Sequence, residues 1–450
     1  MEKLFGTDGV RGLANSELTP ELAFTLGRAA AWHLAGKQGG EIYIGRDPRL
    51  SGAMLESALA AGIASVGINV RLVGVITTPG LAWLTRSSDA VAGAMISASH
   101  NPMEDNGIKF VNTWGIKLAD SQEEAIEHLC LNQQQLPRPT GVNLGRIVRD
   151  EELVEKYVSA LSETANGDFS SIRLVLDCAN GAAWEIAPRV LAATGAQVHV
   201  INAKPDGCNI NDHCGSTHPE TVAAAVVSQQ ADLGLSLDGD SDRMIAVDAS
   251  GNVVDGDKLM MIFARHMKEQ GTLNHDTLVV TVMSNLGLHQ AAEQLGINVA
   301  TTPVGDRYVW EEMAKNDYSL GGEQSGHIIF RQHATTGDGL FSALQLLKIM
   351  ADKKASLAEL ASVMETLPQV LQNVRVAAKN GWEKDAAISQ AIAWAEEQMA
   401  GRGRVLVRPS GTEPVIRVML EGPDKKLLKE LAGEIGKTIQ QQLGRPQQKS

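Results

Sequence analysis

The sequence predicts an α/β protein with three consecutive α/β domains, followed by a small α+β domain at the C-terminal end. Its 450 residues exceed what one hydrophobic core accommodates, because single cores stop growing beyond roughly 250–300 residues. Segments with strand character and helix character alternate along most of the chain, which is typical of α/β layers. After about residue 368 the order of strands and helices changes.

The first predicted block is domain 1–150. Thr19 followed by Pro20 indicates a helix start, because threonine caps the first turn and proline suits the first helical position. This helix is expected to end near Gly36. The other expected elements are strands at 41–45, 69–73 and 91–97 and a helix at 51–66.

Two further blocks repeat the alternation and predict domains 151–255 and 256–368. The second block has expected strands at 173–177, 197–201 and 232–237 and helices at 184–194 and 219–230. The third has strands near 278–282 and 298–301, helices near 286–295 and 305–316, and a long helix from Gly339. Domain 369–450 has a strand at 370–376, a helix at 385–399, a hairpin of 404–407 with 415–420, and a helix at 424–442.

Composition and charge exclude several classes of partner. The formal net charge is −13, and such a surface repels nucleic-acid backbones and anionic lipids. The four cysteines are sparse and irregularly spaced, which does not suggest a disulfide framework: Cys130, Cys178, Cys208 and Cys214. No signal-peptide pattern and no stretch approaching 18 apolar residues is evident. We therefore expect a cytoplasmic protein without a nucleic-acid or membrane partner.

A serine-containing loop, Ser97-Ala98-Ser99-His100-Asn101-Pro102, follows a predicted strand. Ligands bind at the carboxyl ends of strands in α/β sheets, and an activated serine there can act as a nucleophile. The same residue types also form ordinary turns, so this loop by itself leaves both interpretations open. Lys109, a short distance along the chain, adds a cation or proton-transfer group.

A second loop, Asp238-Gly239-Asp240-Ser241-Asp242-Arg243, also follows a predicted strand. Carboxylates at alternate positions repel one another unless a cation lies between them, and ligation by oxygen alone suits Mg²⁺. A calcium-binding EF-hand fits poorly, because Arg243 and Ala249 stand where that loop needs Gly and Glu. The alternative is a solvated acidic loop.

Two more loops carry polar side chains next to glycines. Gly321-Gly322-Glu323-Gln324-Ser325-Gly326-His327 suits a ligand with hydroxyl groups. Arg408-Pro409-Ser410-Gly411-Thr412-Glu413-Pro414, with Arg417 beyond it, combines hydroxyls, a glycine and two arginines as a phosphate cradle would. Each loop alone is weak evidence, because turns rich in Gly, Ser and Thr are common.

Taken together, the four loops resemble those of the α-D-phosphohexomutase superfamily, whose members carry them in this order, one per domain. The resemblance covers essentially the whole chain and includes Phe5-Gly6-Thr7-Asp8-Gly9-Val10-Arg11-Gly12. The segments Asn209-Ile210-Asn211 and Cys214–Glu220, with the Glu-Gln-Ser-Gly-His form of the third loop, are most similar to the bacterial branch that acts on glucosamine phosphates. The resemblance implies mixed sheets and four domains around a central cleft.

The resemblance also implies a role for each motif residue. Ser99 would carry the phosphoryl group, and Asp238, Asp240 and Asp242 would bind one Mg²⁺ together with an oxygen of that phosphate. Arg11 and His100 are further catalytic candidates, and Lys109 and His327 are candidates for proton transfer, with acid and base unassigned. The residues expected to bind substrate are Arg243, Glu323, Gln324, Ser325, Arg408, Ser410, Gly411, Thr412 and Arg417.

The implied activity is an isomerase that interconverts glucosamine 6-phosphate and glucosamine 1-phosphate, with glucosamine 1,6-bisphosphate as intermediate and activator. Its product would feed the synthesis of UDP-N-acetylglucosamine and the cell wall. The nearest alternative is a mutase for glucose or mannose phosphates. Whether the chain forms a homodimer is left open.

Alternatives from other classes explain fewer of the motifs. The segment Leu235–Asp240 resembles the strand and DxD signature of haloacid-dehalogenase phosphatases, which would make Asp238 a nucleophile, but this leaves Asp242, the Ser99 loop and the last domain unused. A phosphosugar-binding protein without catalysis would not need a metal loop beside a serine. A zinc site fits poorly, because no common zinc pattern matches the spacing of Cys208, His213, Cys214 and His218.

Overall fold

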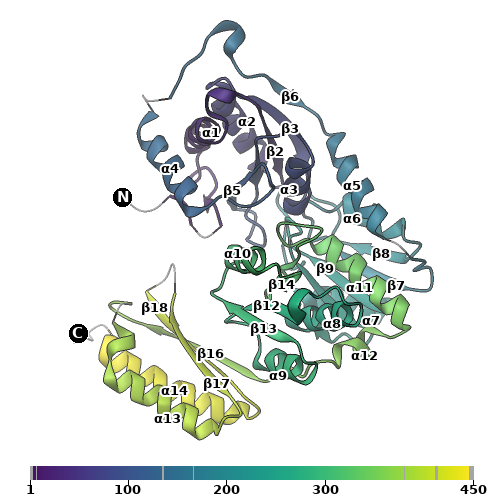
Figure 1. Cartoon of the computed structure of the whole chain (residues 1–450), viewed down its shortest axis with the longest axis vertical. Coiled ribbons are helices and arrows are strands. Elements are labelled where there is room, and N and C mark those ends of the chain that lie inside the picture. The colour runs from purple at the N-terminus through teal and green to yellow at the C-terminus, as the bar shows by residue number, and fades with distance from the viewer. Residues whose placement is uncertain are drawn as a thin grey trace. The chain divides into compact units, whose positions relative to one another are not determined.

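The computed structural model describes residues 4–6, 8–133, 136–165, 167–379, 381–410 and 414–444 (Figure 1). The chain divides into two compact units. The first comprises Met1–Met283 and Leu295–Val363, and the second comprises Ser284–Gln294 and Met364–Ser450. Within the described residues, the first unit contains sheets of six, five and four strands, and the second contains a sheet of three strands.

The first sheet is mixed, with the strand order β1-β5-β4-β2-β3-β6. Strands β4, β2, β3 and β6 pair in parallel, whereas β5 is antiparallel to both of its neighbours. Its strands are β1 Val10–Leu13, β2 Glu41–Arg46, β3 Asn69–Val75, β4 Ala92–Ile96, β5 Asp105–Asn112 and β6 Ile147–Arg149. The helices of this part of the chain are α1 Pro20–Ala35, α2 Gly52–Ala64, α3 Thr78–Arg86, α4 Asp120–Leu131 and α5 Leu153–Thr164.

The second and third sheets are also mixed, with the orders β11-β10-β9-β7-β8 and β13-β12-β14-β15. The second contains β7 Arg173–Asp177, β8 Gln197–Ile201, β9 Leu233–Leu237, β10 Met244–Asp248 and β11 Val253–Val254. The third contains β12 Thr277–Thr281, β13 Asn298–Thr302, β14 Leu320–Gly322 and β15 Ile328–Phe330. Their helices are α6 Ile186–Ala192, α7 Pro219–Gln229, α8 Gly256–Glu269, α10 Asp306–Asn316, α11 Gly339–Lys353 and α12 Leu357–Ala361.

The second unit is built on an antiparallel sheet with the order β16-β18-β17. Its elements are α9 Leu286–Gln294, β16 Gln369–Arg375, α13 Ala386–Met399, β17 Arg404–Pro409, β18 Val415–Glu421 and α14 Lys425–Leu443. Its core is aliphatic and lies between α13, α14 and the sheet, around Ile388, Ile416, Leu431 and Ile435. The expected α+β domain is confirmed.

Local sequence explains where several helices begin. The Thr19 hydroxyl accepts the Leu22 N–H at 3.2 Å, so α1 starts at Pro20 as predicted. Asp424 caps α14 in the same way through the N–H groups of Lys426 and Leu427. Such caps satisfy N–H groups that the first turn of a helix leaves unpaired.

Some elements were absent from the sequence interpretation. Strand β5 contains Asn106-Gly107, a dipeptide typical of turns, and it is held in place by pairing with β4 and β1. The short strands β14 and β15 of three residues each give too little periodicity to recognise. Among the described residues, no helix is both long enough and apolar enough to span a membrane.

Candidate active site

The Ser97–Pro102 loop begins directly after β4, a strand whose residues are all buried. Ser99 has a positive φ of 52°, a left-handed conformation that costs energy for residues other than glycine. Its hydroxyl donates a hydrogen bond to Asp238 Oδ2 at 2.7 Å. The Ser97 hydroxyl is already engaged, because it donates to Asp47 Oδ2 at 2.6 Å and accepts the Ser99 N–H at 2.9 Å. This geometry favours Ser99 as the reactive serine.

Three carboxylates gather in the loop after β9. Asp238, Asp240 and Asp242 are buried, and each offers an oxygen within 4.8 Å of the others. Burial, followed by the neighbouring carboxylates, raises the pKa of Asp238 and of Asp242. Burial also acts to raise the pKa of Asp240, but Lys109 and the hydrogen bond from Thr78 outweigh it and lower that pKa to about 2.

The triad fits a divalent cation. Asp240 Oδ1 and Asp242 Oδ1 are buried and have no hydrogen-bond partner among the described residues, which is costly for a carboxylate. A cation between them would satisfy both oxygens, and a donor set of oxygens alone suits a hard ion such as Mg²⁺. In the described part of the chain, no second group of three such side chains meets in this way.

Lys109, on β5, lies between two carboxylates. Its Nζ is 3.2 Å from Asp240 Oδ2 and 3.5 Å from Asp8 Oδ2. Burial acts to lower the pKa of Lys109, but Asp240 and then Asp8 outweigh it and raise the pKa above its usual value. Lys109 is therefore a fixed cation beside the triad at neutral pH.

Two arginines and a histidine surround the Ser99 side chain. Arg243 Nη1 is 2.8 Å from His100 Nδ1, and Ser99 Oγ is 3.4 Å from the same nitrogen. Burial, then Arg243 and Arg11, lower the pKa of His100 to about 4. The imidazole is therefore neutral at pH 7, with Nδ1 accepting from Arg243.

Arg11 pairs with Asp8. The Nε–H groups of both arginines lack a hydrogen-bond partner among the described residues, and Arg243 Nε lies 3.8 Å from Asp242 Oδ1. These N–H groups suit an incoming phosphate.

The expected sugar loop forms the tip of the β14–β15 hairpin. Glu323 Oε1 accepts the Gly305 N–H at 3.1 Å, and Gln324 Nε2 is 3.4 Å from Asp255 Oδ2. Ser325 is exposed. Glu323 and Gln324 are therefore held by contacts within the protein, whereas Ser325 is open to solvent.

Gly326 explains how this hairpin tip reaches the triad. Its φ is 91°, and a Cβ at this position would lie 2.2 Å from the Met244 carbonyl oxygen. Only glycine permits this approach, and Met244 begins β10, the strand that follows the Asp238–Arg243 loop. The sugar loop and the carboxylate loop are thus in backbone contact.

His327 has a different environment from the other site residues. Its side chain is buried, and Nε2 accepts the Gly337 N–H at 3.0 Å and lies 3.2 Å from Thr336 Oγ1. Nε2 is therefore the unprotonated nitrogen, and Nδ1 has no partner among the described residues. A proton-transfer role for His327 stays a prediction and would have to use Nδ1.

The expected phosphate cradle lies in the second unit. Arg408 and Arg417 are paired across β17 and β18, and burial, followed by Arg417, lowers the pKa of Arg408. Arg417 Nη2 is 3.4 Å from Ser410 Oγ, and Lys379 Nζ donates to the Ser410 carbonyl at 2.8 Å. Two adjacent arginines suit a phosphate dianion. Gly411 and Thr412 lie outside the described residues.

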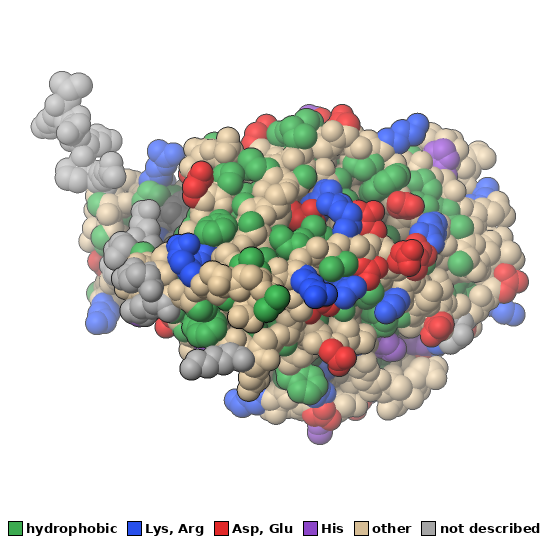
Figure 2. All heavy atoms as spheres, turned by 90° about the horizontal axis from the view of Figure 1, so that it is seen from above, with side chains coloured by type: hydrophobic (Ala, Val, Ile, Leu, Met, Phe, Trp, Pro, Cys, Tyr) green, Lys and Arg blue, Asp and Glu red, His purple; other side chains and the backbone are tan. Residues whose placement is uncertain are grey.

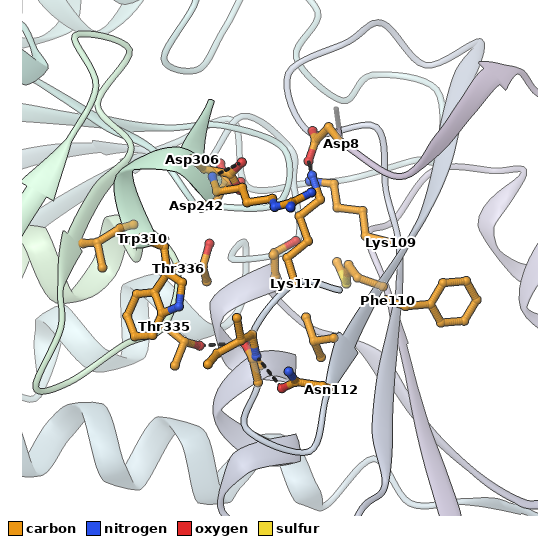
Figure 3. Close-up of a pocket in the computed structure, with 18 of the residues that line it drawn as sticks. Asp8, Lys109, Phe110, Asn112, Lys117, Asp242, Asp306, Trp310, Thr335 and Thr336 are labelled. Atoms are coloured by element: carbon orange, nitrogen blue, oxygen red, sulfur yellow. Dashed lines mark hydrogen bonds and ion pairs between the residues drawn. The ribbon is translucent and has the colours of Figure 1, made fainter. Parts of the chain in front are cut away.

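A cavity of about 350 Å³ adjoins the triad within the first unit. Figure 3 shows Asp8, Lys109 and Lys117 together on one side and the Trp310 ring on the other. The Lys109 corner is polar, and Leu81, Ala82, Ile116 and Ile329 contribute apolar side chains to a lining that also contains Arg307 and Glu311. The cavity offers space next to the proposed reacting groups.

The structure brings most of the predicted first-unit residues together and adds others. The first unit unites Arg11, Ser99, His100, Lys109, Arg243 and the three aspartates. Asp8 and Asn211 were not predicted as site residues, although both lie in segments that carry the family resemblance. Thr78, Arg49 and Lys379 gave no signal in the sequence. The zinc alternative gains nothing, since Cys214 is buried whereas Cys208 is exposed.

Comparison with known protein families finds four models that match in succession. They are the phosphoglucomutase/phosphomannomutase alpha/beta/alpha domain I at residues 2–136, domain II at 155–251, domain III at 255–367 and the C-terminal domain at 371–437. Together they cover most of the chain.

Curated relatives align over nearly the full length. The phosphoglucosamine mutase of Desulforamulus reducens is 55% identical over 442 residues, covering 98% of this chain and 99% of the relative. The phosphoglucosamine mutase of Moorella thermoacetica is 56% identical over 433 residues, covering 96% and 98%.

Solved structures share the fold at lower identity. A phosphoglucomutase/phosphomannomutase family protein from Burkholderia thailandensis has a TM-score of 0.82 at 21% identity, covering 99% of this chain and 98% of its own. Aspergillus fumigatus N-acetylphosphoglucosamine mutase, in complex with GlcNAc-6P and magnesium, has a TM-score of 0.69 at 18% identity, covering 97% and 95%.

Proposed function

The chain belongs to the phosphoglucomutase/phosphomannomutase family, and we propose that it interconverts glucosamine 6-phosphate and glucosamine 1-phosphate. The observation that carries this proposal is an identity of 52% to 56% with full-length curated relatives named phosphoglucosamine mutase. A serine that hydrogen-bonds to a buried carboxylate triad supports the same chemistry. A cytoplasmic location and a homodimer stay predictions for this chain.

We propose that Asp238, Asp240 and Asp242 hold one Mg²⁺ together with an oxygen of phosphorylated Ser99. The buried oxygens of Asp240 and Asp242 that lack a hydrogen-bond partner among the described residues support this assignment, as does the magnesium in the A. fumigatus relative. When bound, the ion supplies neutralisation of the charge that develops on the transferred phosphoryl group.

The chain's own residues supply the rest of the charge and the positioning. A phosphoserine carries about −1.5 to −2 charges, and the Nε–H groups of Arg11 and Arg243 are available for its oxygens. Lys109 stays protonated between Asp8 and Asp240, so it suits charge stabilisation or proton donation and not proton abstraction. Phosphoryl transfer depends mainly on such positioning and charge stabilisation.

One reactive serine must serve two hydroxyls at opposite ends of the sugar, so we propose two successive transfers. In the first, the bond from phosphorus to Ser99 Oγ breaks as a sugar hydroxyl oxygen bonds to phosphorus. The proton of that sugar hydroxyl ends on Ser99 Oγ, so the serine hydroxyl is restored. The product is glucosamine 1,6-bisphosphate. After the sugar turns around, its other phosphate returns to Ser99. In this proposal, Arg408, Ser410 and Arg417 hold the phosphate that is not reacting.

The test is a comparison of kcat/KM for glucosamine, glucose and mannose 6-phosphates with protein phosphorylated at Ser99. We expect the amino sugar to be preferred by roughly tenfold or more, about 1.4 kcal/mol of transition-state binding. Ser99→Ala should lose nearly all activity, and Ser57→Ala, on the exposed face of α2, should lose none. Added glucosamine 1,6-bisphosphate should restore activity to dephosphorylated protein.

Each contrary result has a distinct meaning. Preference for a neutral sugar would assign the chain to the alternative mutases. Peptide mapping that places the phosphate on Asp238 instead of Ser99 would support the phosphatase alternative. Substantial activity in Ser99→Ala would contradict the phosphoserine mechanism.

A further inference from the structure

Arg49 is a fully buried guanidinium directly beneath the Ser99 loop. It follows β2 in the loop that leads to α2, and the residue is 1% exposed. Its charge is balanced by Asp47, whose Oδ2 accepts from Arg49 Nε at 2.9 Å and whose Oδ1 accepts the Arg49 N–H at 3.0 Å. Burying an Arg–Asp pair costs free energy unless the pair is well aligned and its remaining donors are hydrogen-bonded. The partners of the other Arg49 N–H groups therefore indicate the role of Arg49.

Those remaining groups are directed at the Ser99 loop and, through one bond, at Asp105, the first residue of β5. Arg49 Nη2 donates to the carbonyl oxygens of Ser99 and Asn101, both at 2.9 Å. Arg49 Nη1 donates to the carbonyl oxygens of Pro102 and Asp105. One side chain thus binds four backbone carbonyls within a short stretch of chain. Lysine could not reproduce this pattern, because it has three donors on a single nitrogen whereas arginine has five in a fixed fork.

The loop is also held through its N–H side. Ser97 Oγ donates to Asp47 Oδ2 and accepts the Ser99 N–H. Asp47 therefore supports both sets of bonds to Ser99. It orients Arg49 toward the Ser99 carbonyl, and it orients Ser97 toward the Ser99 N–H. The two peptide groups that flank the Ser99 Cα are fixed from the same buried carboxylate.

The Ser99 carbonyl is also contacted by Asn211 and by the loop that contains the carboxylate triad. Asn211 Nδ2 donates to this oxygen at 2.9 Å. A Cβ on Gly239 would lie 2.5 Å from the same atom, so the carboxylate loop packs directly on the Ser99 peptide. Rotation of that peptide would therefore move Ser99 relative to Asp238.

We propose that Arg49, aligned by Asp47 and Ser97, is the positioning residue that holds Ser99 in its left-handed conformation and so aims its phosphoryl-carrying oxygen at the carboxylate triad. The inference rests on the proposed function for its kinetic consequence. Arg49 does not touch substrate. Its effect passes through the Ser99 backbone and is therefore expected in the transfer step, not in sugar binding.

Two variants test the proposal. Arg49→Lys retains the charge but cannot bind four carbonyls, and we expect kcat to fall about 10- to 100-fold while KM for the sugar phosphate changes less than about threefold, because small misplacements of reacting groups have effects of this size. Ser97→Ala keeps the Asp47–Arg49 pair and removes the Ser97 hydroxyl, with its bonds to the Ser99 N–H and to Asp47 Oδ2. It should lower kcat by a smaller factor, again at nearly constant KM.

The matched control is Arg71→Lys. Arg71, on β3 of the same sheet, binds Glu41 through two nitrogens and Asp150 through a third, away from the Ser99 loop. This variant should keep the wild-type kcat. Thermal unfolding of every variant would show whether a loss of kcat merely follows a loss of folded protein.

A crystal structure of Arg49→Lys gives a readout independent of turnover. We expect the Ser99 φ to leave the left-handed region and the 2.7 Å bond to Asp238 to be lost. Unchanged Ser99 geometry, or a kcat within twofold of wild type in both variants, would overturn the proposal. If wild-type protein converts none of the hexose phosphates, the proposed function fails, and the Ser99 geometry in the variant still decides the positioning role.

Discussion

Asp240 in the carboxylate triad uses one of its two oxygens for hydrogen bonds within the protein and leaves the other without one in the described part of the chain. Asp240 Oδ2 accepts from Thr78 Oγ1 at 2.6 Å and lies 3.2 Å from Lys109 Nζ, whereas Asp240 Oδ1 has no partner among the described residues. Thr78 thereby orients the carboxylate so that one oxygen remains for a cation. Groups in this position commonly change metal affinity when removed.

We therefore expect Thr78→Val to raise the Mg²⁺ concentration needed for half-maximal activity about 10-fold or more. Both side chains are β-branched and similar in volume, so the loss would be that of the hydroxyl. The measurement is a Mg²⁺ titration of the rate, repeated as a calorimetric titration without substrate. Thr85→Val is the control, because Thr85 lies in the same helix, α3, but its hydroxyl donates to the Leu81 carbonyl. An unchanged Mg²⁺ requirement in Thr78→Val would contradict the role.

Helices α1 and α2 pack against each other at two glycines, and Figure 1 shows them side by side. A Cβ on Gly27 would lie 2.4 Å from the Leu59 carbonyl oxygen, and one on Gly62 would lie 2.2 Å from the Phe24 carbonyl oxygen. The backbones are therefore in contact at both positions. This close packing helps to fix α2, and with it the loop that carries Arg49.

Gly27→Ala or Gly62→Ala should lower the free energy of unfolding of the first unit by about 1–3 kcal/mol, because the added methyl group forces the helices apart. Gly433→Ala provides the opposite case within α14, since a Cβ there meets no atom within 4 Å. It should raise the free energy of unfolding of the second unit by up to about 1 kcal/mol through helix propensity. Urea unfolding of the three variants measures both effects. If all three substitutions raised the free energy of unfolding, the helices could accommodate the added methyl groups at Gly27 and Gly62, and the prediction would be wrong.

At the scale of the molecule, acidic side chains lie both on the surface and, as at Asp338, in the interior. Figure 2 shows Lys and Arg side chains interspersed with Asp and Glu on the visible face, and the chain as a whole carries −13 charges. Inside the first unit, the Tyr157 hydroxyl on α5 donates to Asp338 Oδ2 at 2.7 Å. Asp338 also caps α11 by accepting the Phe341 N–H at 3.0 Å. This contact joins segments 181 residues apart.

Burial raises the pKa of Asp338 from 3.8 to about 6, even though the Phe341 N–H and the Tyr157 hydroxyl act to lower it. The folded state therefore binds this proton more tightly than the unfolded state. The contribution of Asp338 to stability is greatest below pH 3.8 and is lost as the pH rises through about 6. The whole effect amounts to roughly 3 kcal/mol, at about 1.4 kcal/mol per pKa unit.

Asp338→Asn removes this titration, so its stability relative to wild type should be higher at pH 7 than at pH 4.5. Urea unfolding at the two pH values measures the difference. Tyr157→Phe removes a donor to the carboxylate and should move the wild-type transition to higher pH. A difference between Asp338→Asn and wild type that is equal at both pH values would contradict the assignment.

Features encoded locally could be predicted from the sequence. The α1 start at Thr19-Pro20 depends on residues within one turn, and it was correct because capping is a local interaction. The alternate spacing of Asp238, Asp240 and Asp242 likewise indicated a cation site, and the folded chain does place their oxygens within 4.8 Å of one another. The four loops and the change to an α+β pattern near residue 368 are also read from short segments.

What the sequence could not determine depends on contacts between distant segments. Ser99 was chosen over Ser97 through the family resemblance, and the contacts that distinguish the two serines join distant segments: Ser99 bonds to Asp238 across 139 positions, and Ser97 bonds to Asp47, 50 positions before it. Lys109 becomes a fixed cation only because β5 pairs between β1 and β4 and brings it to Asp240, 131 positions later. The role of Arg49 follows from carbonyls of a loop that begins about 50 residues further on. Local sequence determined which groups are available, and tertiary packing decided which of them meet, because burial and hydrogen bonding act between neighbours in space.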